Sequence, residues 1–284
     1  MTILKLKLKE KPARVYSTRD KILNALETKL INSIKKNVGL KNEFGIAFSG
    51  GIDSALLAFL CKKLNLNFKL FTVSINDTDD LFWARKISGH FKLPITIKVI
   101  DFDNSLEIIK KVCKLLKTDN PVQVGIGCTL YSVLEQAKIE NKETIMTGLG
   151  SDSLFCGFNK HKKAFENNLI DEEYQEGMEN VYDVDVKRDN CIANSFKISL
   201  ALPYLEKEFS EYSSKIDPKL KISKDQNKII LRELALKLGM RREFALRKKL
   251  AAQYGSGFDK AIEVFTKENG FKYKREFLQS LLKK

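Results

Sequence analysis

The stretch that decides the fold is Phe44-Gly45-Ile46-Ala47-Phe48-Ser49-Gly50-Gly51-Ile52-Asp53-Ser54. Its first five residues form a short apolar run, which predicts a buried strand. A serine and two glycines interrupt that run, and residues 53–64 continue with leucines at helical spacing. The stretch therefore predicts a strand, a tight glycine turn and a helix, in that order.

A glycine turn of this kind is suited to bind phosphate. The start of a helix presents unpaired backbone N–H groups and the positive end of its dipole, and glycines let phosphate oxygens approach the main chain. A carboxylate beside bound phosphate favours a Mg²⁺ ion between the two. The candidate nucleotide-binding residues are therefore Ser49, Gly50, Gly51, Ile52, Asp53 and Ser54, and no G-x-x-x-x-G-K-[ST] loop is present.

Strand and helix patterns alternate on both sides of this turn. Strands are predicted at 44–48, 68–74, 95–100 and 144–147, and helices at 53–64, 79–90, 105–116 and 128–138. Such alternation is typical of βαβ units on a parallel sheet. The expected organisation is a lead-in strand (3–8) and helix (19–36) within 1–42, an α/β core over 43–160, and a helical part over 161–284 that includes helices at 225–238 and 258–268.

A second glycine turn follows the strand at 144–147, and its candidate binding residues are Gly148, Leu149 and Gly150. Ligands of open α/β sheets bind beyond the carboxyl ends of the strands, where this turn and the first are expected to lie. Asp152 follows directly and offers a second carboxylate. We therefore expect both turns to contact one nucleotide.

Residues 49–54 resemble the PP-loop, S-G-G-x-D-S, of the ATP pyrophosphatase superfamily. Residues 147–158 are similar to the G-x-G-[AS]-D-E-x-F-G-G-[YF] segment of asparagine synthetases and β-lactam synthetases. Four later segments extend the likeness in the same order over about residues 43–257, and the last is closest to archaeal asparagine synthase-related and eukaryotic asparagine synthetase domain-containing proteins. These segments are Arg188-Asp189-Asn190, Leu202-Pro203-Tyr204-Leu205-Glu206, Lys228-Ile229-Ile230-Leu231-Arg232 and 247–257.

The resemblance implies an α/β fold in which helices sandwich a parallel sheet, of the adenine nucleotide alpha hydrolase-like, N-type ATP pyrophosphatase kind. It implies that Asp53 and Asp152 share Mg²⁺ on the pyrophosphate and that Lys228 meets the phosphates. A cation is needed there because departing pyrophosphate carries concentrated negative charge. Adenine is expected at the end of the second strand, near Val73 and Ser74, with Phe48 in the wall.

The chain departs from the synthetase pattern at two positions of the second turn. Leu149 stands where true asparagine synthetases carry the Glu of G-E-G, and Ser153 replaces the following acid. Glu to Leu removes a charged group from the place expected for acid–base work, which counts against aspartate as the acceptor. Residue 2 is Thr and not the Cys nucleophile of a glutaminase domain. Ammonia is therefore expected to arrive free or from a separate partner, or the nucleophile is not ammonia.

The composition argues against several classes of protein, among them disordered, disulfide-rich and membrane proteins. The chain has 284 residues, a net charge of +14, 43% hydrophobic and 30% charged residues, which excludes general disorder. Five scattered cysteines without a C-x-x-C pair argue against disulfides and thiolate metal sites. Without a long apolar run or a signal peptide, no membrane association and a cytoplasmic location are expected.

The function we expect is ATP-dependent adenylation of a carboxylate or amide-type oxygen, with release of pyrophosphate and then displacement of AMP by a nitrogen nucleophile. One alternative is a tRNA-modifying PP-loop enzyme, which the basic charge favours and the even spread of that charge does not. Another is a degenerate ATP-binding regulatory subunit, which Leu149 and Ser153 motivate. His90, His161, Cys156 and the acidic stretch 171–185 are given no catalytic role.

Overall fold

A parallel sheet forms the centre of the computed structural model, which describes residues 14, 17–39, 43–248 and 251–283. In this described part, five strands pair in the order β3-β2-β1-β4-β5, and every neighbouring pair is parallel. The expected fold class is confirmed. The strands are β1 (Phe44–Ala47), β2 (Phe68–Ile75), β3 (Ile95–Ile100), β4 (Thr144–Met146) and β5 (Ser199–Ala201).

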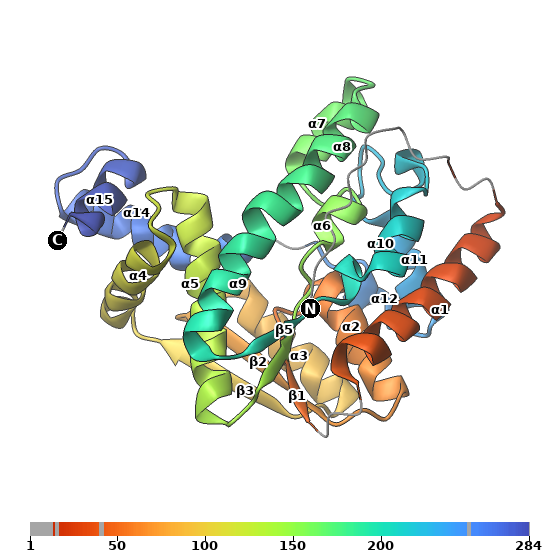
Figure 1. Ribbon diagram of the computed structural model, residues 1–284, viewed down its shortest axis with the longest axis horizontal. Helices are drawn as coiled ribbons and strands as arrows, with labels where there is room; N and C mark the ends of the chain where they lie inside the picture. The colour runs from red at the N-terminus through yellow and green to blue at the C-terminus, as the bar shows by residue number, and fades with distance from the viewer. Residues whose placement is uncertain (1–13, 15–16, 40–42, 249–250, 284) are drawn as a thin grey trace.

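Helices connect the strands and make up most of the second half of the chain (Figure 1). They are α1 (Arg19–Val38), α2 (Ile52–Lys63), α3 (Asp79–Phe91), α4 (Phe102–Leu116), α5 (Pro121–Ile139), α6 (Ser151–Leu154), α7 (Asn159–Glu166), α8 (Ile170–Asn180), the π-helix η1 (Val181–Val186), α9 (Lys187–Phe196), the 3₁₀ turn η2 (Pro203–Leu205), α10 (Lys207–Ser214), the 3₁₀ turn η3 (Pro218–Leu220), α11 (Ile229–Lys237), α12 (Arg242–Ala245), α13 (Ala252–Gly255), α14 (Phe258–Glu268) and α15 (Lys274–Leu282).

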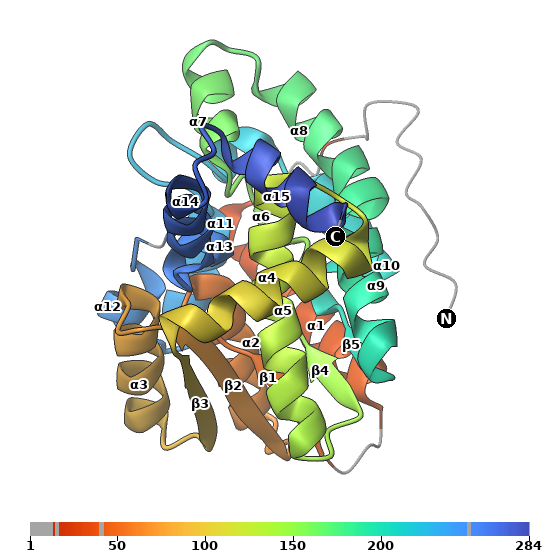
Figure 2. The ribbon, with the colours of Figure 1, turned by 90° about the vertical axis from the view of Figure 1, so that its left-hand side faces the viewer.

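Both faces of the sheet are covered, which explains why the strands read as continuous apolar runs. Successive residues of a strand point to opposite faces, and Leu70 and Phe71 of β2 accordingly belong to two different apolar clusters. Helices α1, α2, α3 and α11 pack on one face, and α4, α5, α14 and α15 on the other. Figure 2 views the sheet with α4 and α5 in front.

The four expected strands are all present, but three helices begin three residues or more away from their expected starts. Helix α4 begins at Phe102 instead of residue 105. Helix α5 begins at Pro121 instead of residue 128, with its first turn capped by Asn120. The glycines that obscure its pattern allow close packing, since a Cβ at Gly125 would lie 2.8 Å from Cβ of Gln253. Helix α11 begins at Ile229 instead of residue 225, because Lys228 before it adopts a left-handed conformation with φ 54°.

Strand β5 was not expected, and it brings the second half of the chain into the sheet. Its three residues pair with β4, with Ala201 opposite Met146. The expected strand at 3–8 lies outside the described residues. Among the helices that the structure describes, none combines the length and apolar character required to span a bilayer.

Candidate functional site

The first glycine turn joins the carboxyl end of β1 to the start of α2. Gly50 has φ +65°, and a Cβ there would lie 3.1 Å from the backbone of Trp83 and of Ala84. Only glycine combines that conformation with so close a neighbour. Gly51 is the N-cap of α2, so the N–H groups of the helix's first turn have no partner within the helix. The turn offers main-chain donors and a positive dipole end to an anion.

Arg247, far away in sequence, holds this turn against α3. Its guanidinium donates to the Ser49 carbonyl at 2.9 Å and to the carboxylates of Asp79 at 2.8 Å and Asp80 at 2.6 Å. It also lies 5.3 Å from the ring centroid of Trp83. Arg247 belongs to a segment that resembles the family, but its contacts were not predicted from the sequence. The guanidinium therefore links the turn to the start of α3 and fixes its shape.

The second glycine turn lies directly beside the first. A Cβ at Gly148 would be 2.9 Å from Cβ of Asp53, so glycine is needed for the two turns to approach. Gly150 has φ +91° and leads into α6. The Ser151 hydroxyl donates to Oδ1 of Asp53 at 2.5 Å. The expectation that both turns meet at one edge of the sheet therefore describes the structure correctly.

Lys228 brings the two candidate carboxylates together. Its Nζ lies 2.7 Å from both carboxylate oxygens of Asp53 and 2.8 Å from Oδ1 of Asp152. The left-handed conformation of Lys228, at the start of α11, directs its chain there, and Asn227 anchors the same loop by donating to the Gly157 carbonyl at 2.8 Å. Three residues predicted from three separate segments thus meet at one point.

The charge of Lys228 is maintained although its side chain is only 6% exposed. Burial by itself lowers the pKa of the amine, but the carboxylates of Asp152 and Asp53 outweigh burial and raise the pKa above its usual value. Asp152 is the accessible member of the group, at 43% exposure. The site therefore holds the Lys228 amine between two carboxylates, beside the first glycine turn.

The described residues include no cluster of three or more His, Cys, Asp or Glu side chains arranged to hold a metal. Mg²⁺ needs only one or two protein carboxylates when phosphate oxygens complete its shell. Asp53 and Asp152, whose oxygens already converge on the Lys228 amine, fit that requirement. Because these oxygens already contact the amine, a divalent ion bound there would compete with Lys228 for them.

The side chains of the three residues expected around adenine pack in the apolar core or form a hydrogen bond within the protein. Phe48 lies in the apolar cluster on the α1–α3 face, and Val73 in the cluster on the opposite face. The Ser74 hydroxyl donates to the Asn76 carbonyl at 3.0 Å. These residues can offer a base their main chain and the edge of an apolar wall.

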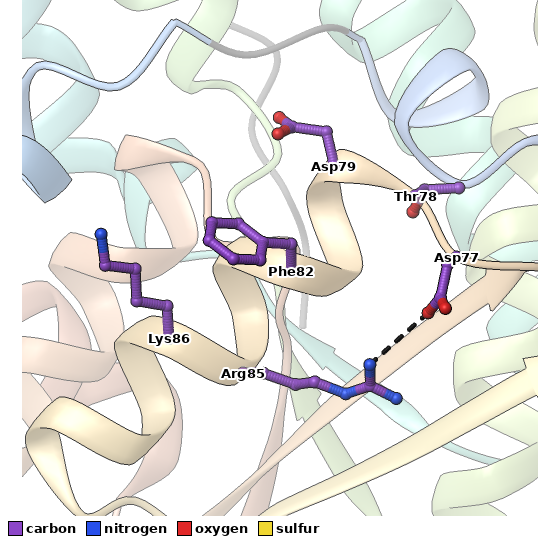
Figure 3. A pocket seen from close by; sticks show the side chains of 6 residues that line it. All are labelled: Asp77, Thr78, Asp79, Phe82, Arg85 and Lys86. Carbon is purple, nitrogen blue, oxygen red and sulfur yellow. Dashed lines mark hydrogen bonds and ion pairs between the residues drawn. The ribbon is translucent and has the colours of Figure 1, made fainter.

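An open depression lies just beyond β2, at the start of α3. Its volume is about 660 Å³, and it is lined by Asp77, Thr78, Asp79, Phe82, Arg85 and Lys86. Figure 3 shows the ring of Phe82 between the chains of Asp79 and Lys86, and the ion pair between Arg85 and Asp77. The depression is therefore next to the strand end at which adenine is expected.

Leu149 lies at the junction between the second turn and an apolar cluster. It is partly exposed and packs against Val181, Tyr182, Val186, Leu202 and Leu205. These residues come from η1 and from the segment after β5, so the second half of the chain supplies the surroundings of this position. An aliphatic side chain suits this environment, whereas a glutamate would lose solvation there.

Arg188 and Asp189 of the family-like segment are both buried and bonded to each other. Arg188 donates to Asp189 and to Asp185 at 2.7 Å, and to Gln123 at the start of α5 at 2.9 Å. Burial raises the pKa of Asp189, while the neighbouring Arg188 opposes that rise. The network fastens α9 to α5 at the end of the sheet where the glycine turns lie.

Cys156 and His161, which were given no catalytic role, are both buried. Burial raises the pKa of the Cys156 thiol to about 12, which disfavours a reactive thiolate. His161 is buried, its Nδ1 accepts from the Phe158 N–H at 3.3 Å, and its Nε2 has no partner. In the acidic stretch, Asp171 pairs with Arg14 and Asp185 with Arg188.

Comparison with known proteins adds the following. A family model described as asparagine synthase matches residues 25–180 and 168–269. A protein of Methanocaldococcus jannaschii, assigned to the glutamine-hydrolyzing asparagine synthetases, is 28% identical over 91% of this chain and 54% of its own length. Human asparagine synthetase [glutamine-hydrolyzing] is 26% identical over 75% of this chain and 39% of its own length. The chain thus spans about half or less of the length of these relatives.

Two solved structures cover 94% of this chain and 94% of their own. One is the NMN synthetase of Francisella tularensis, with a TM-score of 0.44 and 14% identity. The other is the NH3-dependent NAD synthetase of Campylobacter jejuni, with a TM-score of 0.42 and 15% identity.

Proposed function

This chain belongs to the asparagine synthase family, and from that premise we propose that it is an ATP-dependent, AMP-forming ligase. A carboxylate or amide-type oxygen of the acceptor attacks the α-phosphorus of ATP, and pyrophosphate leaves. A nitrogen nucleophile then attacks the adenylated carbon and displaces AMP. The observation that carries this proposal is the meeting of Lys228 with Asp53 and Asp152 beside the glycine turn at 49–51.

In this proposal the first turn binds the β- and γ-phosphates. Main-chain N–H groups of Gly50, Gly51, Ile52 and Asp53 and the hydroxyls of Ser49 and Ser54 are the donors. Lys228 neutralises the pyrophosphate as it departs, and this interaction strengthens in the transition state because charge accumulates there. The carboxylates that now hold the amine keep it charged and correctly placed until phosphate arrives.

Mg²⁺ is the metal that the donor set fits, and Asp53 and Asp152 are the residues that would hold it. When bound, the ion neutralises phosphate charge and keeps the leaving pyrophosphate in one orientation. The chain's own contribution is positional. Ser151 holds Asp53 through its hydroxyl, and the close approach of Gly148 keeps the two turns together.

The nucleoside portion is assigned to the end of β2. Main-chain groups around Val73 and Ser74 face the base, with Phe48 in the wall behind them. The second turn, Gly148-Leu149-Gly150, closes over the α-phosphate from the other side. Positioning and electrostatics carry most of the rate in this arrangement, as is general for reactions at phosphorus.

The acceptor we propose is a small carboxylate or amide other than aspartate. Leu149 packs on an apolar cluster where an acid–base glutamate would be needed for aspartate amidation. Nitrogen comes as ammonia, free or from a separate partner protein. Assaying wild type with aspartate, ammonia and Mg·ATP tests this assignment: we expect no AMP formation above the rate without acceptor, and an increase of tenfold or more with aspartate would contradict it.

The function is tested by measuring pyrophosphate and AMP formation with Mg·ATP over small carboxylates, amino acids, amides and tRNA. We expect one small acceptor to support turnover, and Asp53→Ala to lower that turnover by about 10²-fold or more. Asp103→Ala, on the exposed side of α4, is the matched control. If ATP binds but neither AMP nor pyrophosphate forms, the proposal that the chain is an enzyme is wrong. If tRNA is the only acceptor that supports turnover, the proposal of a small carboxylate or amide acceptor is wrong.

A further inference from the structure

The loop that ends at Lys228 begins at a second buried lysine, Lys221, which has no place in the reaction described above. Its side chain is fully buried. Its Nζ donates to the Tyr174 hydroxyl and to the Ser213 carbonyl, each at 2.8 Å. The amine also lies 4.1 Å from the centroid of the Tyr174 ring. Buried lysines are rare because removing an ammonium from water is costly, so this one calls for an explanation.

The first consequence of this arrangement concerns the helix that carries Asp152. The hydroxyl of Tyr174, which accepts from Lys221, itself donates to the carbonyl of Leu154 at 3.3 Å. Leu154 is the last residue of α6, and Asp152 lies two positions earlier in the same short helix. A single hydroxyl therefore separates the buried amine from the element that positions one carboxylate of the site.

The second consequence concerns Lys228 itself. The carbonyl of Lys221 accepts from the N–H of Ile229 at 2.8 Å, and Ile229 follows Lys228 directly. Within the loop, the N–H of Ser223 donates to the Gln226 carbonyl at 2.8 Å. Because both ends of the loop are joined at Lys221, the position of that residue sets where α11 starts and where the Lys228 chain departs.

We propose that Lys221 is a positioning residue, which fixes the α6 helix with Asp152 and the loop with Lys228 relative to each other. This inference rests on the proposed function, in which those two side chains receive pyrophosphate. An apolar side chain of similar length would fill the space at lower cost, but it could not donate to Tyr174 and Ser213. The hydrogen bonds of the amine are what the position requires.

The test uses the full chain with Lys221→Met, and pyrophosphate with Mg²⁺ as the probe of binding. Calorimetric titration should show binding weakened about tenfold, because a misplaced cation contacts the anion less closely. Lys219→Met, in the same segment but exposed, is the matched control and should bind as wild type. Tyr174→Phe keeps the ring but removes the link to Leu154, and it should weaken binding by about threefold.

The outcomes separate this inference from the function itself. If wild type binds no pyrophosphate, the proposed function fails whatever the variants do. If wild type binds and Lys221→Met, still folded by circular dichroism, binds equally well, then Lys221 only stabilises the fold and the inference is overturned. Where Lys221→Met does not fold, Tyr174→Phe decides: unchanged affinity in that variant overturns the inference.

Discussion

Two buried lysines at opposite ends of one short loop have opposite surroundings. Lys228 lies between the carboxylates of Asp53 and Asp152, which raise the pKa of its amine against the effect of burial. Lys221 donates to a phenol and a carbonyl, and burial lowers the pKa of its amine to about 7, although Cys156 and Asp217 oppose that shift. A buried lysine near carboxylates stays charged, whereas one near neutral acceptors approaches neutrality.

The difference distinguishes a cation held for a ligand from an amine held for its hydrogen bonds. In the proposed mechanism phosphate replaces the carboxylates around Lys228, because both are anions that accept charge-assisted hydrogen bonds from an ammonium group. No anion takes the place of the Tyr174 hydroxyl or the Ser213 carbonyl at Lys221. Both lysines are solvent-excluded, so burial alone does not identify the one that serves chemistry.

The largest expected effect is the loss of activity when Lys228 is replaced. Lys228→Met should lower the rate of pyrophosphate release by about 10²–10³-fold, because the leaving group loses its only buried protein cation in the proposed mechanism. Steady-state pyrophosphate assays at saturating Mg·ATP measure it, with Lys237→Met on the exposed face of the same helix as control. Equal losses of activity in Lys228→Met and Lys237→Met would show that the position of Lys228 between two carboxylates gives it no special role in the reaction.

A second prediction uses pH to examine Lys221. Its pKa is about 7 when folded and about 10.4 when unfolded. Between these values the unfolded chain binds the extra proton, so stability rises with pH. From pH 7 to pH 9 wild type should gain about 2 kcal/mol relative to Lys221→Met, in which nothing titrates at this position.

Urea unfolding at both pH values measures that difference, and the comparison with Lys221→Met removes the contribution of other titrating groups. Lys219→Met should follow the wild-type curve, since its lysine is exposed. A gap between wild type and Lys221→Met that stays constant with pH would mean that Lys221 remains fully charged when folded, and the contrast with Lys228 would be lost.

The smallest effect concerns a third buried base, His161, on which burial outweighs the nearby carboxylate of Glu173. Burial lowers its pKa to about 4, with Lys160 adding to the shift. The unfolded chain therefore binds the proton first as pH falls through about 6.5, and stability is lost. Between pH 7 and pH 5.5 wild type should lose about 1 kcal/mol more than His161→Gln, as measured by urea unfolding; parallel curves would contradict this.

The parts of the site that could be predicted are those in which local sequence determines local geometry. Residues 44–54 identify a strand, a turn and a helix because apolar run, glycines and helical spacing follow one another. The strands predicted at 68–74 and 95–100 were confirmed for the same reason, as β2 (Phe68–Ile75) and β3 (Ile95–Ile100). Since the carboxyl ends of parallel strands share an edge, the meeting of Asp53 with Asp152 followed from topology.

What escaped prediction depends on contacts between distant segments. Ser199-Leu200-Ala201 is too short to show a strand pattern, and only its pairing with β4 makes it one. Lys221 looks like any surface lysine in sequence, because its burial is produced by Tyr174 and Ser213 from other elements. Helix α5 extends through two glycines whose small size serves packing, a reason that a single sequence does not display.

The guanidinium of Arg247 has a consequence for how the protein is made. It donates to the carbonyl of Ser49, and 198 positions of chain separate the two residues. During synthesis the turn at 49–51 emerges long before the side chain that holds its shape. Contacts so distant in sequence are slow to form. A growing polypeptide therefore cannot hold the turn at 49–51 in its final shape until residue 247 has been synthesised and has reached it.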